Sequence, residues 1–170
     1  TMTQNVMAEF RKRILVHRSA ELQNKIYECF SFMVQKDSII QGILIDPDTL
    51  DIKLIDYNGN ELLKDQLSAG EKQLFAVSII WGLAQSSGYD MPVIIDTPLG
   101  RLDSQHRKNF VERYLPFASK QVIVLSTDEE VNGKYWDLIK PNVNAVYTLV
   151  YDEAQHGSSI QSGYFGGQQV

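Results

Sequence analysis

Cysteine is almost absent from this 170-residue sequence, and long apolar runs are missing altogether. Because Cys29 is the one cysteine, no disulfide can form within the chain, and a reducing compartment is favoured. No apolar run approaches the length of a membrane-spanning helix, and the start shows no signal-peptide pattern. We therefore expect a cytoplasmic protein without a membrane partner. The opening residues, Thr1 to Gln4, lead us to expect a piece of a longer chain.

The sequence also lacks concentrated positive charge and clustered metal ligands. Its 16 Lys and Arg against 21 Asp and Glu give a net charge of −5, which does not predict nucleic-acid binding by the chain as a whole. A basic cluster lies at residues 11–18, where a solvated helix face is a better interpretation than a phosphate contact. The three histidines are far apart in the sequence, so they indicate no metal centre.

The most informative absence is that of a P-loop, G-x-x-x-x-G-K-[ST], anywhere in the chain. Without this loop the chain has nothing to wrap the α- and β-phosphates of a nucleotide and no P-loop lysine. The chain is therefore either half of a nucleotide-binding head or not a nucleotide-binding protein at all.

A short strand ending in an acid is the feature around which the sequence is organised. Three β-branched residues, Val93 to Ile95, lie between Pro92 and Pro98 and indicate a strand buried on both faces in a parallel sheet. Asp96 follows at the carboxyl end, where open α/β sheets bind their ligands. Such an Asp holds Mg²⁺ in nucleotide hydrolases. Many strands end in Asp at a turn, however, and for this element alone the turn is the better interpretation.

A second element precedes it, at the start of a long apolar-periodic run. Ser68 and Glu71 have the spacing of a capping box, in which the serine caps the first helical turn and the glutamate reaches back. The same Ser68 hydroxyl, with the bare backbone of Gly70 and the N–H groups of a helix N-terminus, would suit a γ-phosphate. Both interpretations can hold together.

Three segments together resemble the C-terminal lobe of an SMC-like ABC ATPase head. Leu67–Gln73 resembles the ABC signature motif in its SMC-type form. Val93–Asp103 resembles a Walker B strand that runs into a D-loop, and Val122–Asp128 resembles the following strand and switch loop. The match covers roughly residues 65–130. The sequence of Ile95–Asp103 most resembles that of the DndD family, the ATPases of the bacterial DNA sulfur-modification (phosphorothioation) system.

The resemblance implies a role for each motif, with ATP and Mg²⁺ as cofactors. Asp96 would hold Mg²⁺ through water on the nucleotide of its own head. The nucleotide of a partner head would be met by the signature residues Ser68, Gly70, Glu71 and Gln73. The candidate catalytic residues are Thr97, Asp103, Thr127 and Asp128, with Glu129 as a further carboxylate that could lie near the γ-phosphate.

Two positions depart from the ABC pattern. Thr97 stands where these ATPases usually carry a glutamate that polarises water, and Thr127 stands where they usually carry the switch histidine. A hydroxyl is a poor general base near neutral pH. The sequence therefore leaves open whether hydrolysis is slow or depends on a partner.

The fold expected is α/β, a P-loop NTPase-type lobe with a mostly parallel sheet. From about residue 5 to residue 34 no Gly or Pro interrupts the chain and apolar residues recur at helical spacing, which predicts one long helix. The resemblance implies that residues 1–34 are the last helix of a coiled-coil arm, residues 35–154 the ATPase lobe, and residues 155–170 a partly irregular tail or final edge segment. In the first part of the lobe the patterns predict a hairpin from residues 39–46 and 50–57 and a largely buried helix after residue 70. After the Asp96 strand they predict a helix through residue 114 and a buried strand at residues 122–125, which should lie beside the Asp96 strand. A helix at residues 130–139 and a strand at residues 145–151 should follow.

The function expected is ATP binding and hydrolysis at a head–head interface, in DNA sulfur modification. The enzyme would act only when an N-terminal lobe brings the Walker A loop. Its other partners would be a second head, DNA and further DNA sulfur-modification proteins. Two alternatives remain open: an SMC-like ATPase of DNA repair or restriction, and a non-hydrolysing interaction domain with decayed motifs.

Overall fold

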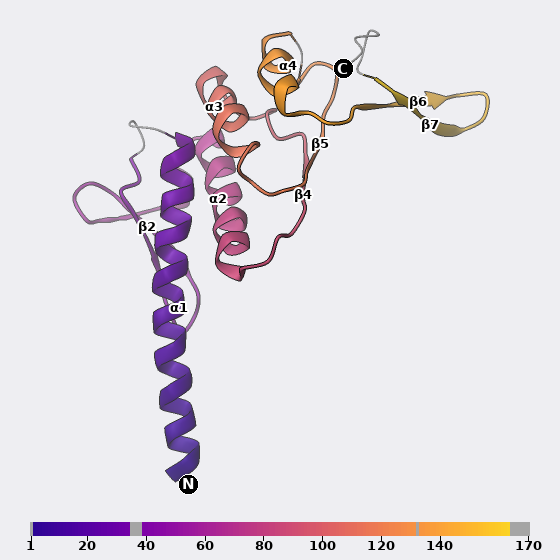
Figure 1. The fold of residues 1–170 in the computed structure, drawn as a ribbon. Helices are drawn as coiled ribbons and strands as arrows, with labels where there is room; N and C mark the ends of the chain where they lie inside the picture. The colour runs from indigo at the N-terminus through magenta and orange to yellow at the C-terminus, as the bar shows by residue number, and fades with distance from the viewer. Residues whose placement is uncertain (1, 35–38, 132, 164–170) are drawn as a thin grey trace.

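The computed structural model describes residues 2–34, 39–131 and 133–163. Helix α1 (Met2–Val34) is the long helix that the uninterrupted apolar spacing predicts. Its first part, as far as Arg18, is exposed, whereas Ile26, Phe30 and Met33 are buried. Figure 1 shows this first part extending beyond the rest of the molecule, with the N-terminus at the far end. The helix is thus anchored in the lobe by its second half alone.

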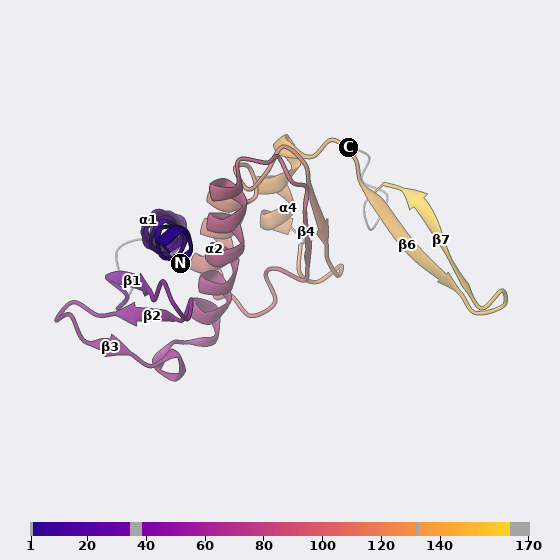
Figure 2. The ribbon, with the colours of Figure 1, turned by 90° about the horizontal axis from the view of Figure 1, so that it is seen from below.

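A small antiparallel sheet covers one side of the anchored half of α1 (Figure 2). Its strands are β1 (Gly42–Ile45), β2 (Ile52–Ile55) and β3 (Glu61–Leu62), in that spatial order. The hairpin predicted from the sequence is confirmed by the pairing of β1 with β2. Ile43 faces Leu54 across this pair, and both are buried.

Helix α2 (Ala69–Ser87) follows the 3₁₀ turn η1 (Lys64–Gln66) and packs along α1. The two backbones approach closely at Gly82, because a Cβ placed there would lie 2.7 Å from Ile26 Cγ1 and 3.1 Å from Ile26 Cα. We expected α2 to be largely buried, and this is wrong for its outer face. Ile80 and Leu83 are 61% and 48% exposed.

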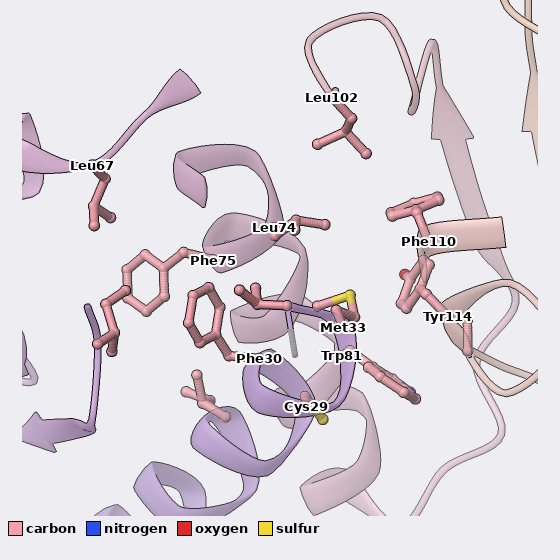
Figure 3. Packing of buried hydrophobic residues seen from close by; sticks show 14 of the residues in the cluster. Cys29, Phe30, Met33, Leu67, Leu74, Phe75, Trp81, Leu102, Phe110 and Tyr114 are labelled. Atoms are coloured by element: carbon pink, nitrogen blue, oxygen red, sulfur yellow. The ribbon is translucent and has the colours of Figure 1, made fainter. Parts of the chain in front are cut away.

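The core lies where α1, α2 and a π-helical turn, η2 (Phe110–Tyr114), meet (Figure 3). Phe30 and Phe75 meet edge to face at 6.1 Å between ring centroids, and Trp81 and Tyr114 do so at 5.1 Å. Burial raises the pKa of the Cys29 thiol to about 11 and that of the Tyr114 hydroxyl to about 12. Both groups therefore stay protonated at neutral pH, and Cys29 acts as a core residue.

Strands β4 (Val93–Asp96) and β5 (Val122–Leu125) form the predicted parallel pair. They are connected by α3 (Ser104–Asn109) and η2. Asp103 caps α3.

Burial on both faces of this pair was expected and is wrong for one face. Ile94 on β4 is 65% exposed, and Ile123 and Leu125 on β5 are 41% and 47% exposed. Their neighbours Ile95 and Val122 pack against the core from the opposite face. The strand sequences thus have the composition of a covered sheet, but this chain covers only one side of it.

The remaining strands form a separate ribbon. After α4 (Gly133–Ile139) and the 3₁₀ turn η3 (Lys140–Asn142), β6 (Tyr147–Asp152) pairs antiparallel with β7 (Gly157–Ser162), which lies in the segment expected to be a tail. Figure 2 shows this ribbon extending away from the other elements. Within the described residues the mostly parallel sheet is thus represented by two strands, β4 and β5. Residues 164–170 of the predicted tail lie outside the described residues.

Across those same described ranges, no helix combines the length and the apolar character needed to cross a membrane.

Candidate functional site

The capping box at the start of α2 is present. The Ser68 hydroxyl oxygen accepts the N–H of Glu71 at 3.2 Å, and the Glu71 carboxylate accepts the N–H of Ser68 at 3.0 Å. The Ser68 hydroxyl also donates to Glu71 Oε2 at 2.8 Å. Ser68 is exposed, so its hydroxyl lies at an accessible helix N-terminus, where an anion is stabilised by the helix dipole. The Glu71 carboxylate fixes this end of the helix.

Gly70 is buried, in contrast to the bare backbone expected of it. A Cβ built on Gly70 would lie 3.5 Å from His106 Nδ1, 3.6 Å from the Arg101 carbonyl oxygen and 3.7 Å from Leu102 Cδ2. The start of α2 therefore packs directly against the end of the loop that follows β4 and the start of α3. These are ordinary contact distances, so an alanine side chain would fit at this position.

Asp96 ends β4 with an exposed side chain, on the same uncovered face of the pair as Ile94. Among the described residues no three His, Cys, Asp or Glu side chains gather into a metal centre. An isolated, accessible carboxylate suits Mg²⁺, which keeps several waters and binds through one or two carboxylates together with substrate phosphates. The residues present therefore fit one protein ligand of a magnesium–nucleotide complex, with the remaining ligands supplied by other groups.

The backbone of Thr97 is strained, which the sequence does not predict. Its φ is +45°, in the left-handed region that β-branched residues rarely adopt. Its N–H still continues the strand ladder, donating to the Leu125 carbonyl oxygen at 2.8 Å. Strain of this kind costs about 1–3 kcal/mol and clusters at binding and catalytic sites. Thr97, which the resemblance predicts to be a catalytic residue, is thus held in an unusual backbone conformation.

Asp103 is fully engaged as a helix cap. Its Oδ1 accepts the N–H groups of Gln105 at 3.0 Å and His106 at 2.9 Å, and its Oδ2 lies 2.8 Å from His106 Nδ1. The hydrogen bond from the His106 backbone is the main cause that holds the pKa of Asp103 below its usual value. A lower pKa makes a carboxylate a weaker base, so this geometry favours capping over proton abstraction.

Thr127 and Asp128 are exposed in the turn that follows β5, closed by a hydrogen bond from Glu130 N–H to the Thr127 carbonyl oxygen at 3.3 Å. Glu129 is exposed in the same turn. Because β4 and β5 are parallel, their carboxyl ends meet at one edge of the pair. Thr127 and Asp128 therefore follow the same edge as Asp96 and Thr97.

Two contacts at this edge were not foreseen. Gln73 Nε2 donates to the Pro98 carbonyl oxygen at 2.6 Å, and the buried Glu130 carboxylate accepts the N–H of Leu99. Gln73 was expected to meet nucleotide, and Glu130 was not singled out at all. Glu130 is the third of three consecutive acids, and nothing in the sequence distinguishes the buried one from its exposed neighbours.

Helix α2 and the end of β4 are thus joined at one end of the lobe. Solved structures share the overall fold of the chain. One structure, from a study of ATP-driven dimerization and DNA-stimulated activation of SMC ATPases, aligns with a TM-score of 0.64 at 14% identity, over 90% of this chain and 89% of that one. The chain has the fold of an SMC head domain. Its α/β architecture is therefore confirmed.

Two further structures carry a coiled coil as well. The Smc head domain with an extended coiled coil from Pyrococcus furiosus, bound to the C-terminal domain of ScpA, aligns with a TM-score of 0.69 at 16% identity. The Smc head domain with a coiled coil and joint from Pyrococcus yayanosii aligns with a TM-score of 0.69 at 17% identity. This chain spans 38% and 29% of their respective lengths, with 93% of its own residues in each case.

No family model matches the sequence, and no curated protein matches it either. The similarity to solved structures, at identities of 14–17%, is one of fold. DNA sulfur modification and the individual roles of the site residues therefore remain predictions.

Proposed function

We propose that this chain is the C-terminal lobe of an SMC-like ATPase head, which binds and hydrolyses ATP between two heads. The observation that carries the proposal is the contact between the Ser68-capped helix α2 and the Asp96-bearing end of β4, made through Gln73 and the Pro98 carbonyl oxygen. An ABC-type head needs these two elements side by side, since one contacts the partner's nucleotide and the other its own.

An N-terminal lobe would supply the P-loop and cover the exposed face of β4 and β5. Support comes from the missing P-loop in the sequence and from the apolar side chains of that face. Asp96 would hold Mg²⁺, which neutralises phosphate charge during hydrolysis. Ser68 would meet the γ-phosphate in the partner head, with Gly70, Glu71 and Gln73 shaping that helix end. The exposed half of α1 would continue into a coiled-coil arm.

ATP hydrolysis is the step that separates this proposal from the non-hydrolysing interaction domain. Thr97 and Thr127 replace the usual glutamate and histidine, so water must be positioned by their hydroxyls or by Asp128 and Glu129. A non-hydrolysing interaction domain is the outcome if none of these groups suffices.

The test uses the complete head, with the P-loop lobe present. Asp96→Ala should abolish Mg²⁺-dependent ATP hydrolysis while the melting temperature stays near that of the parent. Asp90→Ala is a matched control, because Asp90 is an exposed carboxylate near the opposite end of the same strand. Turnover by Asp96→Ala within about threefold of the parent would contradict the magnesium role. A parent head with no turnover would favour the interaction domain.

Head dimerisation tests the signature helix separately. Ser68→Arg should block ATP-dependent dimerisation, measured by light scattering, because a long cation would occupy the place of the partner's phosphate. Loss of the cap costs only about 1 kcal/mol, so the fold should survive. Ser87→Arg, at the other end of α2, is the control and should dimerise normally. Equal dimerisation of both variants would reduce the motif to a helix cap.

We further propose that the head acts in the cytoplasm in DNA sulfur modification, with DNA and the other proteins of that system as partners. The support is the resemblance of Ile95–Asp103 to the DndD family. In a host that modifies its DNA, the Asp96→Ala allele should remove phosphorothioate linkages, measured by mass spectrometry of digested DNA. Unchanged phosphorothioate content would instead favour a DNA-repair or restriction-linked ATPase.

A further inference from the structure

The peptide bond between Pro98 and Leu99 is held from both sides. Its carbonyl oxygen accepts a hydrogen bond from Gln73 Nε2 at 2.6 Å, and its N–H donates to the Glu130 carboxylate. This peptide is trans, so its C=O and N–H point in opposite directions. Pro98 and Leu99 are themselves buried. The two side chains therefore fix the plane of one peptide that lies two residues beyond Asp96.

The two side chains come from different motifs. Gln73 lies on α2, just over one helical turn after Ser68. Glu130 lies two residues after Asp128, beyond the end of β5. The signature helix, the turn after β4 and the turn after β5 are thus linked through a single peptide group.

Each of the two side chains has a buried polar atom that is costly to keep for folding alone. Glu130 is 6% exposed, and its Oε2 has no hydrogen-bond partner among the described residues. Gln73 Oε1 is likewise buried without a partner there. Buried polar atoms that make no hydrogen bond destabilise a fold. Two such atoms belong to the side chains that hold this one peptide, next to the strained backbone of Thr97. They indicate that the two contacts serve to fix where this turn lies and not to stabilise the fold.

We propose that Gln73 and Glu130 are positioning residues for ATP hydrolysis. They clamp the Pro98–Leu99 peptide, and through it they hold Thr97 and Asp96 at the nucleotide. On the proposed function, on which this inference rests, Ser68 meets the nucleotide of the partner head whereas Asp96 serves the nucleotide of its own. The clamp therefore couples the two ATP sites of a dimer, because a shift of α2 is passed to the end of β4.

The clamp makes opposite demands on the two side chains. A carbonyl oxygen requires a donor, so Gln73→Glu should break the clamp by placing a carboxylate against it. An N–H requires only an acceptor, so Glu130→Gln should preserve the clamp through its amide oxygen. Gln73→Glu and Glu130→Gln exchange the same two residue types in opposite directions. If hydrogen bonding is what matters, only Gln73→Glu should impair the clamp; if the Glu130 charge matters, Glu130→Gln should impair it as well.

The experiment measures steady-state ATP hydrolysis by the complete head. Gln73→Glu and Glu130→Ala should lower kcat by about tenfold or more, as misplaced reacting groups do. The KM for ATP should stay within about threefold, since the P-loop lobe supplies most nucleotide binding. Glu130→Gln should keep kcat within about threefold of the parent. The controls are Gln85→Glu, on the exposed side of α2, and Glu112→Ala, on the exposed side of η2.

Hydrogen exchange of the Leu99 amide provides a readout that does not depend on turnover. Exchange should become faster in Glu130→Ala and stay slow in Glu130→Gln. Parental turnover in Gln73→Glu, equal loss in Glu130→Gln and Glu130→Ala, or unchanged Leu99 exchange in Glu130→Ala would each overturn the clamp. If Glu130→Ala fails to fold, Gln73→Glu and Glu130→Gln still decide. A parent that does not hydrolyse ATP would overturn the proposed function, and Leu99 exchange would then decide the clamp on its own.

Discussion

The helical side of the lobe and its strand side differ in how completely they cover their apolar surfaces. On the helical side, Phe30 of α1 is 1% exposed and Leu74 of α2 is fully buried. On the strand side, Ile94 of β4 is 65% exposed, Leu149 of β6 is 68% exposed and Ile160 of β7 is 70% exposed. The same kinds of residue are therefore enclosed on one side and bare on the other.

The bare side chains share faces and are not scattered. Ile94 pairs with Ile123 across β4 and β5, and Leu149 pairs with Ile160 across β6 and β7. An isolated two-stranded ribbon is marginally stable in water at best. Contiguous apolar faces of this kind mark interaction surfaces. The apolar side chains of the helical side are thus enclosed within this chain. Those of the strand side remain exposed and would be covered by another segment, which we propose to be the P-loop lobe.

The largest loss of stability is expected from a substitution in the enclosed core of the helical side. Phe30→Ala should lower the free energy of unfolding by about 3–5 kcal/mol, because it removes a fully enclosed ring and its contact with Phe75. Phe10→Ala on the same helix should change it by less than about 0.5 kcal/mol, because Phe10 is 59% exposed. Denaturant unfolding measures both values. Similar losses in the two variants would show that the first half of α1 is covered as well.

A smaller effect is expected where α1 and α2 come closest. Gly82→Ala should destabilise by about 1–3 kcal/mol, since the new methyl would lie 3.1 Å from the Ile26 backbone. Helix propensity alone predicts the opposite sign, a gain of about 1 kcal/mol. Ala76→Gly, on the exposed face of α2, serves as the reverse control and should follow propensity. A stabilised Gly82→Ala variant would show that the helices separate easily.

The finest comparison lies within β4, between two neighbouring isoleucines. Ile95→Thr should cost about 1 kcal/mol or more in this chain alone, because Ile95 packs against the core. Ile94→Thr should cost less than about 0.5 kcal/mol, because its side chain faces solvent. Once the P-loop lobe is added, Ile94→Thr should weaken association of the two pieces. Equal unfolding energies combined with unchanged association would remove the distinction between the two faces.

Local patterns predicted the elements of this fold well. The apolar spacing indicated α1, the Ser68–Glu71 spacing indicated the cap of α2, and the β-branched run Val93–Ile95 indicated β4. Each of these signals depends on neighbours along the chain, so the sequence carries it directly. The motif order likewise led to an SMC-type head, whose fold the solved structures share.

What the sequence did not reveal depends on contacts between distant segments. Burial of β4 on both faces was inferred from its apolar composition. Composition shows that a strand could be covered on both faces, but it does not show whether this chain contains the segments that would cover it. The sequence left residues 155–170 open between an irregular tail and a final edge segment, because Gly157–Ser162 is mostly polar and small, with Ile160 as its one large apolar side chain. The link from Gln73 to Pro98 spans 25 residues, and the link from Glu130 to Leu99 spans 31. No spacing rule reaches that far.

Calorimetric titration with Mg²⁺–ATP tests the central claim, that this chain is half of a nucleotide-binding head. A helix N-terminus contributes only about 0.3–1 kcal/mol to anion binding, whereas micromolar affinity requires about 8 kcal/mol. The 170 residues alone should therefore show no measurable binding, and adding the P-loop lobe should produce it. Tight, Mg²⁺-dependent binding of ATP by these residues with no second lobe present would contradict the account.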